Sequence, residues 1–211
     1  MKDKKILFIT GTRADYGKIK SLLVAVQRTK FKLHLFVTGM HLEKKYGYTI
    51  NEIKKGNFPN VYIFENHTNG YDMDIKLSVT VQGISKYVKS INPDLIVVHG
   101  DRLEALSGAI VGAFNNILVG HIEGGEVSGT VDELIRHSIS KLSHLHFVSN
   151  LEAKKRLLQM GESSDTINVI GSPDIDIMFS DNLPDINSAL KYYNVHFDKY
   201  SILMFHPVTT E

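Results

Sequence analysis

The chain has 211 residues, which is more than one minimal domain and less than two full ones. Its 24 basic and 23 acidic residues give a net charge of +1, which argues against the clustered excess of Lys and Arg that nucleic-acid binding needs. Cysteine is absent, which excludes thiol catalysis and disulfides and fits the cytoplasmic location that we expect. The first apolar run, residues 6–9, is too short for a secretory signal, and no uncharged stretch is continuously apolar, so we expect no membrane association.

Short apolar segments rich in β-formers alternate with longer segments of helical spacing. Several of the short segments are apolar on both faces, as at Leu95-Ile96-Val97-Val98, which is typical of parallel strands covered by helices on both sides. Hydrophobic stripes at three- and four-residue spacing predict helices over 77–91 and 103–114. This alternation predicts a doubly wound, Rossmann-like parallel α/β sheet. The predicted strands are 5–10, 32–38, 60–64, 94–99, 117–122, 144–149 and 167–170, and loops are expected at 39–47 and 65–72.

A break in organisation follows the seventh predicted strand, at Gly171-Ser172-Pro173. Beyond it the spacing predicts helices over 174–180 and 186–193 and a strand over 201–205. A parallel strand needs neighbours, and few residues remain to supply them. We therefore predict one complete domain over residues 1–172 and the start of an incomplete, second Rossmann-like domain over 173–211.

The residues directly after each strand are the candidates for chemistry, because ligands bind beyond the carboxyl ends of parallel strands. After the first strand, Gly11 allows a tight turn, and the following helix N-terminus can bind an anion with the help of Arg13 and Lys18. Thr12 and Asp15 also fit a capping box, so a purely structural role for this segment stays open.

Two carboxylates follow neighbouring predicted strands. Asp101 comes after the fourth strand and Glu123 after the fifth, so both can face one crevice and divide acid and base work. Asp101 and Glu104 also fit a capping box, which leaves a structural alternative for Asp101. Glu123 lies in a glycine-rich loop with no helix to cap, which favours a functional role.

A third carboxylate, Asp132, falls in the first turn of a predicted helix. The helix macrodipole favours a carboxylate there, so Asp132 has a structural explanation as well as a functional one. Thr130 and Glu133 fit another capping box, and His137 follows Glu133 by four residues as an exposed pair would.

Ten histidines raise the question of a metal site. His99 and His121 each stand two residues before a carboxylate, but the stronger metal-binding spacings are missing. We therefore predict no metal and no cofactor.

Five motifs occur in order along nearly the whole chain, and together they resemble the N-terminal half of a hydrolysing UDP-N-acetylglucosamine 2-epimerase of the bacterial sialic-acid-pathway type. The run from His121 to Thr130 is the most specific of them. The motifs are Arg13-Ala14-Asp15-Tyr16, His99-Gly100-Asp101-Arg102, His121-Ile122-Glu123-Gly124-Gly125-Glu126-Val127-Ser128-Gly129-Thr130, Ile135-Arg136-His137 and His206-Pro207-Val208-Thr209-Thr210.

The resemblance implies a two-domain fold of the glycosyltransferase-B type with its active site between the two halves. It implies conversion of UDP-N-acetylglucosamine and water to N-acetylmannosamine and UDP, through elimination to a glycal and hydration. By position, Asp101, Glu123 and Asp132 match the acid/base set. The positions that match substrate contacts are Arg13, Gly17, Lys18, Arg102 and His206.

The resemblance also implies a UDP-sugar as the partner and a homo-oligomer, either dimer or tetramer. Most of the nucleotide pocket belongs to the second domain in this family, so we expect the 211-residue chain alone to be inactive. Two alternatives stay open. One is a hydrolysing 2-epimerase acting on a UDP- or GDP-linked 2,4-diacetamido-2,4,6-trideoxyglucose, as in legionaminic acid pathways, and the other is a non-catalytic half-cleft module.

Overall fold

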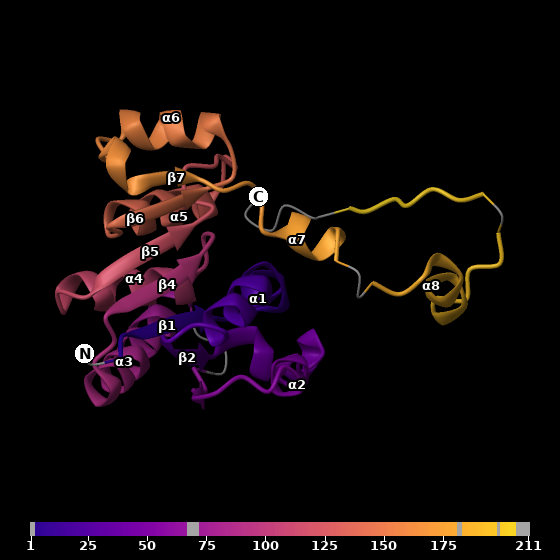
Figure 1. Cartoon of the computed structure of the whole chain (residues 1–211), viewed down its shortest axis with the longest axis horizontal. Coiled ribbons are helices and arrows are strands. Elements are labelled where there is room, and N and C mark those ends of the chain that lie inside the picture. Colours follow the sequence, from indigo (N-terminus) through magenta and orange to yellow (C-terminus); the bar gives the residue numbers. More distant parts are fainter. Residues whose placement is uncertain (1–2, 67–71, 181–182, 198, 206–211) are drawn as a thin grey trace. The chain divides into compact units, whose positions relative to one another are not determined.

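The protein is described by a computed structural model that covers residues 3–66, 72–180, 183–197 and 199–205. Within these residues, seven parallel strands form one sheet in the order β3-β2-β1-β4-β5-β6-β7 (Figure 1). Each of the seven predicted strands is confirmed to within one or two residues at its ends. The strands are β1 Lys5–Thr10, β2 Lys32–Val37, β3 Val61–Ile63, β4 Leu95–His99, β5 Leu118–Ile122, β6 Leu145–Val148 and β7 Ile167–Val169.

Helices connect successive strands, as the hydrophobic stripes predict. The predicted loop over 39–47 instead contains two single-turn 3₁₀ helices, η1 Gly39–Leu42 and η2 Lys44–Tyr46, and part of the predicted loop over 65–72 lies outside the described residues. A further 3₁₀ turn is η3 Ser164–Thr166. The α-helices are α1 Arg13–Gln27, α2 Ile50–Lys55, α3 Met73–Ile91, α4 Leu103–Phe114, α5 Val131–Lys141, α6 Leu151–Gln159, α7 Asp174–Met178 and α8 Ile186–Tyr192.

The hydrophobic core lies on both faces of the sheet, because successive strand residues point to opposite sides. On one face, Phe8 of β1 packs in a cluster with residues of α1 and α2, such as Ile19 and Ile53. On the other face, Leu7 packs with residues of α3, α4 and α5. The two layers of helices lie on either side of the sheet in Figure 1, which confirms the doubly wound architecture.

The order of the strands reverses between β1 and β4. From β1 the chain first builds outward through β2 and β3, then returns to place β4 on the other side of β1, with Ile6 opposite Leu95. The connections that leave the carboxyl ends of β1 and β4 therefore diverge, and they open the crevice in which doubly wound sheets bind ligands.

The chain divides into two compact units, Met1–Asp174 and Ile175–Glu211. Helices are present where they were predicted after residue 173. The strand predicted over 201–205 is wrong, because these residues have no regular secondary structure and no strand pairs with them among the described residues. No described residue of the second unit is buried, so the described part of this unit has no hydrophobic core of its own.

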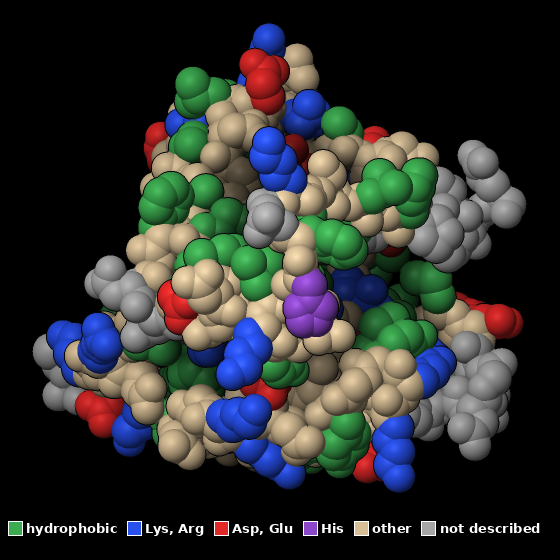
Figure 2. All heavy atoms as spheres, turned by 90° about the vertical axis from the view of Figure 1, so that its right-hand side faces the viewer, with side chains coloured by type: hydrophobic (Ala, Val, Ile, Leu, Met, Phe, Trp, Pro, Cys, Tyr) green, Lys and Arg blue, Asp and Glu red, His purple; other side chains and the backbone are tan. Residues whose placement is uncertain are grey.

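The surface is of mixed character. On the face shown in Figure 2, basic, acidic and hydrophobic side chains are interspersed, which agrees with a net charge close to zero. Within the described parts of the chain, no helix combines the length and the apolar composition that crossing a bilayer requires.

Candidate active site

Glu123 directly follows β5, at the carboxyl edge of the sheet. Its backbone is left-handed, with φ of 60°, a conformation that non-glycine residues rarely adopt. The backbone N–H of Glu123 donates to the carbonyl of Phe147 at 2.8 Å, which ties the turn to β6. Unfavourable backbone conformations of this kind concentrate at functional sites, so this turn supports a functional role for the side chain.

The carboxylate of Glu123 contacts polar side chains from four different parts of the chain. Lys18 Nζ of α1 lies 2.6 Å from Oε2, and His99 Nε2 at the end of β4 lies 2.9 Å from the same oxygen. The other oxygen, Oε1, accepts from Ser172 Oγ at 2.9 Å and from Ser149 Oγ at 3.4 Å. His99 and the two serines were not among the predicted site residues.

This cluster holds Glu123 as a carboxylate. Burial alone would raise the pKa of Glu123, but the hydrogen bonds and electrostatic interactions with His99 and Lys18 outweigh it and lower the pKa to about 2. Burial likewise tends to lower the pKa of Lys18, but Glu123 and Asp174 raise it above its usual value. Lys18 Nζ is 3.3 Å from Asp174, so two carboxylates share this ammonium group.

Asp101 does not cap α4, contrary to one of the two interpretations of its sequence position. The N-cap of α4 is Arg102, which makes no side-chain capping hydrogen bond. Asp101 instead pairs through Oδ2 with Nη2 of Arg136, a nearly buried side chain of α5. Arg136 Nη1 also donates to the carbonyl of Glu126 at 3.1 Å, so this arginine ties Asp101 to the loop that follows β5.

A small pocket of about 90 Å³ opens between β1 and β4, at the position where the strand order reverses. Three of the predicted site residues lie in its wall, and Glu123 contacts two of the lining residues directly. Gly100 has φ of +72°, which a side chain would strain, so glycine suits this turn between His99 and Asp101. The lining residues are Thr12, Ala14, Asp15, Lys18, His99, Gly100, Asp101 and Arg102.

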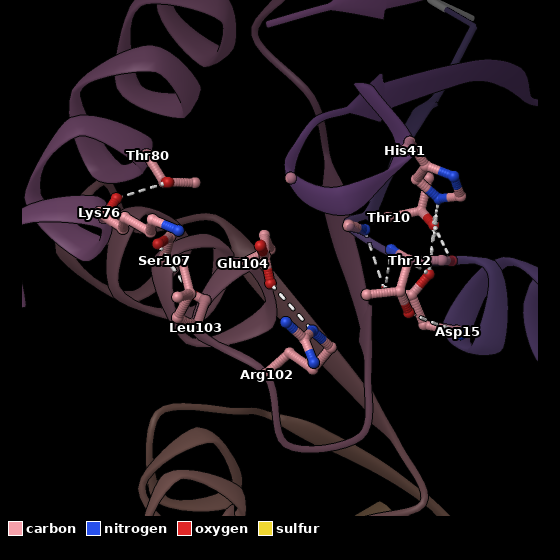
Figure 3. Close-up of polar contacts among 12 residues, drawn as sticks. Thr10, Thr12, Asp15, His41, Lys76, Thr80, Arg102, Leu103, Glu104 and Ser107 are labelled. Carbon is pink, nitrogen blue, oxygen red and sulfur yellow. Dashed lines mark hydrogen bonds and ion pairs between the residues drawn. The ribbon is translucent and has the colours of Figure 1, made fainter. Parts of the chain in front are cut away.

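The loop between β1 and α1 is braced by Asp15. Thr12 and Asp15 form the predicted capping box, which is confirmed. The Asp15 carboxylate also accepts from the backbone N–H of Gly11 at 3.0 Å and from the hydroxyl of Thr10, a network drawn in Figure 3. The structural interpretation of Asp15 is therefore correct, and it coexists with a place in the pocket wall.

The remaining predicted site residues are less closely gathered. Arg13 is exposed at the first position of α1, and Gly17 lies in the next turn of the same helix. Asp132 is exposed in the first turn of α5 and makes no side-chain hydrogen bond or ion pair with the described residues. His206 lies outside the described residues, so the structure does not place it.

His121, although close to Glu123 in sequence, serves the fold. It is fully buried, with Nδ1 3.1 Å from Ser140 Oγ and Nε2 2.7 Å from the carbonyl of Gly100. Burial lowers the pKa of His121 to about 3, so the ring is neutral, and both of its nitrogens have partners. Within the described ranges, no group of three or more His, Asp or Glu side chains is arranged to hold a metal ion.

Comparison with solved structures identifies the architecture. The chain superposes with a TM-score of 0.75 on the crystal structure of UDP-GlcNAc 2-epimerase from Neisseria meningitidis bound to UDP-GlcNAc, at 22% identity, covering 90% of this chain and 51% of that one. The class is therefore a Rossmann-like α/β protein corresponding to the N-terminal half of a two-domain fold of the glycosyltransferase-B type, as the sequence predicts.

The sequence comparisons then identify the family. The family model for UDP-N-acetylglucosamine 2-epimerase matches residues 24–211, and the chain belongs to this family. It is 53% identical over 209 residues to UDP-N-acetylglucosamine 2-epimerase of Neisseria meningitidis serogroup B, covering 99% of this chain and 55% of the relative. It is 38% identical to the hydrolysing UDP-N,N'-diacetylbacillosamine 2-epimerase of Legionella pneumophila, covering 99% of this chain and 56% of the relative. The chain thus spans about half the length of the curated relatives that it matches.

Proposed function

We propose that this chain is the catalytic N-terminal half of a hydrolysing 2-epimerase that converts UDP-N-acetylglucosamine and water to N-acetylmannosamine and UDP in sialic acid biosynthesis. The observation that carries the proposal is the cluster of Lys18, His99 and Glu123 beside the pocket between β1 and β4. The name of the relative at 53% identity supports the substrate, and the name of the Legionella relative supports the hydrolysing reaction. Residues 173–211 then begin the second domain, which supplies the rest of the nucleotide site.

The proposed reaction has two steps that balance without a redox cofactor. A base takes the proton from sugar C2 while the bond between C1 and the diphosphate oxygen breaks. This releases UDP and leaves a 2-acetamidoglycal with a double bond between C1 and C2. Water then adds its oxygen to C1, and a proton returns to C2 on the opposite face. The chemistry needs two proton-handling groups and positive charge beside the departing diphosphate.

The carboxylates have different surroundings, which suits two different proton-handling roles. Glu123 is ionised and contacts four polar side chains, whereas Asp101 is paired with one guanidinium and lies in the pocket wall. Asp132 is exposed, and its proposed acid/base role rests on the family resemblance alone.

Positive charge for the leaving group comes from side chains in and beside the same pocket. Lys18 and Arg102 line the pocket, and Arg13 stands exposed at the N-terminus of α1, where the helix dipole favours an anion. We propose that these cations, with the backbone at Gly17, bind the diphosphate. His206 is proposed as a contact from the second domain. The cytoplasmic location and the homo-oligomer expected from the sequence stay predictions.

The test uses a chimera of two proteins. Residues 1–211 replace the corresponding N-terminal half of the Neisseria meningitidis serogroup B relative that is 53% identical to this chain. This chimera is incubated with UDP-N-acetylglucosamine in deuterated water, and the released sugar is followed by NMR. We expect UDP and free N-acetylmannosamine carrying deuterium at C2, and no turnover by the 211-residue chain alone. Release of UDP-N-acetylmannosamine with its nucleotide attached would exclude the hydrolysing reaction, and retention of hydrogen at C2 would exclude the glycal.

A second candidate substrate follows from the Legionella relative, whose name specifies UDP-N,N'-diacetylbacillosamine. The same chimera is therefore offered this nucleotide sugar and its GDP form in parallel. We expect UDP-N-acetylglucosamine to have the highest kcat/KM of the three. A higher kcat/KM for a diacetamido sugar would move the assignment to the legionaminic acid type.

A further inference from the structure

Glu104 is a buried carboxyl group for which the proposed reaction has no use. It lies in the first turn of α4, three residues after Asp101, and its exposed fraction is only 4%. A carboxyl group is rarely buried to this extent unless it has a partner. Because Glu104 lies one turn from the pocket wall, the identity of its partner shows whether Glu104 acts on a pocket residue.

The space that Glu104 occupies is made by two glycines. A Cβ atom on Gly11 would lie 2.6 Å from Cδ of Glu104, and a Cβ atom on Gly39 would lie 2.5 Å from Oε1. Gly39 also has φ of +62°, which a side chain would strain. The turns after β1 and β2 are thus both shaped to admit this one side chain.

The walls of this slot are themselves held in place. The backbone N–H of Gly39 donates to Oδ1 of Asn66 at 3.2 Å, and Nδ2 of Asn66 donates to Oγ1 of Thr80 in α3 at 2.9 Å. Asn66 is 3% exposed, so this link is itself part of the core. Glu104 therefore enters a rigid slot and has little freedom to turn toward another partner.

The partner of Glu104 is Arg102. Nε of Arg102 lies 3.4 Å from Oε2 of Glu104, and Figure 3 shows the two side chains directed toward each other between α4 and the loop that begins α1. Burial raises the pKa of Glu104, and the nearby charge of Arg102 opposes this rise. The side chain of Arg102 is 36% exposed and lines the pocket, so the pair connects the buried slot to the open crevice.

We propose that Glu104 is a positioning residue that holds Arg102 by its Nε–H and thereby presents the guanidinium to the departing diphosphate. An arginine has five N–H donors in one plane, so a partner at Nε fixes the plane and leaves the donors on the two Nη atoms for oxygen ligands. Glu104 itself, almost fully buried, does not reach the substrate. This inference rests on the proposed function only for the identity of the anion.

The contact is tested first on the 211-residue chain by NMR of the arginine Nε–Hε signals. The Arg102 signal is assigned by its loss in Arg102→Lys. We expect Glu104→Gln to move this signal upfield and to speed its exchange with water, and Glu52→Gln, which removes an exposed carboxylate far along the chain, to leave it unchanged. If Glu104 only fills space, Glu104→Gln will leave the Arg102 signal unchanged. An unchanged Arg102 signal would therefore overturn the proposal.

If Glu104→Gln does not fold, a reciprocal measurement on Arg102 still tests the pairing. Arg102→Gln changes a partly exposed side chain, and the titration of the Glu104 carboxyl carbon is followed in it. Loss of the guanidinium is expected to raise the apparent pKa of Glu104 further. A titration that does not respond to Arg102→Gln would contradict the pairing.

Kinetics in the chimera test the consequence for the substrate. Glu104→Gln is expected to raise KM for the nucleotide sugar about tenfold, the effect of one hydrogen bond to a charged group, with a smaller change in kcat. In the Arg102→Gln background, Glu104→Gln is expected to add no further effect, and multiplied effects would overturn the proposal. A chimera with no turnover would count against the proposed function, whereas the NMR result would still decide whether Glu104 positions Arg102.

Discussion

Lys18 and Glu123 are 105 positions apart in the chain, and their charged atoms are 2.6 Å apart at the carboxyl edge of the sheet. Lys18 belongs to the helix after β1, and Glu123 to the loop after β5. In the proposed function, their contact brings the ammonium group that binds the diphosphate and a carboxylate of the acid/base set to one point. A substrate phosphate would compete with Glu123 for Lys18, so binding the leaving group would release the carboxylate for proton transfer.

The first prediction concerns this carboxylate. Glu123→Gln in the chimera is expected to lower kcat by at least about 100-fold, because the amide cannot exchange a proton with sugar C2 or water. Deuterium incorporation and UDP release measure this directly. Glu152→Gln, at an exposed position of α6, is the matched control and is expected to leave kcat unchanged. Near-normal turnover with Glu123→Gln would remove Glu123 from the acid/base set.

The second prediction is a dependence of stability on pH. The pKa of Glu123 is lowered from 4.5 to about 2 in the folded chain, so the unfolded chain takes up this proton first as the pH falls. The stabilisation is complete above about pH 4.5 and is lost between there and about pH 2, and it amounts to at most about 3 kcal/mol. Urea unfolding at pH 6 and pH 3 measures the loss. Glu123→Gln is expected to reduce the difference in unfolding free energy between pH 6 and pH 3. An unchanged difference would contradict the lowered pKa of Glu123.

The third prediction separates the fold from the chemistry at Asp101. Asp101→Asn removes the anion beside the nearly buried Arg136, so we expect the free energy of unfolding to fall by about 1–3 kcal/mol while the chain still folds. Turnover of the chimera is expected to fall by far more than this loss of stability explains. Asp165→Asn, an exposed change, serves as the control for charge. An unchanged midpoint of urea unfolding would show that the pair with Arg136 contributes nothing to stability.

The fourth prediction uses the space around two helix glycines. A Cβ atom on Gly17 would meet nothing within 4 Å, so Gly17→Ala is expected to stabilise the chain by about 0.5–1 kcal/mol. A Cβ atom on Gly108 would lie 2.3 Å from Cδ1 of Ile9, so Gly108→Ala is expected to destabilise it. Thermal unfolding of both variants shows whether each change raises or lowers the stability. A higher KM of the chimera with Gly17→Ala, despite its higher stability, would support a backbone contact to the nucleotide.

The fifth prediction tests the slot around Glu104. Gly11→Ala places a Cβ atom against Cδ of Glu104 and is expected to lower the free energy of unfolding by about 1–3 kcal/mol. Glu104→Ala alone removes a buried group and is also expected to destabilise. The two changes together are expected to destabilise less than the sum of the single changes, because the shortened side chain makes room for the new methyl group. Simple addition in a double-mutant cycle would show that the two positions do not share this space.

The strands were open to prediction because each one is a short apolar segment whose pattern does not depend on distant residues. The partners at the site were less accessible. Asp101 fits a helix cap by its spacing, and only the folded chain shows that Arg136, 35 residues further on, takes its carboxylate. Ser172 reaches Glu123 in the same way from beyond β7. Residues 201–205 have the composition of a strand, but a strand also needs a neighbour to pair with.

Because β1 and β4 lie side by side although β2 and β3 come between them in the chain, the pocket joins segments that are far apart in the sequence. Lys18 follows β1 and its carboxylate follows β5, so the ion pair depends on the strands that lie on that side of β1. The Lys18–Glu123 pair therefore requires both parts of the sheet to be in place. A spectroscopic probe at either side chain would report whether these two parts of the sheet are joined, and no fragment ending before Glu123 would contain the pair.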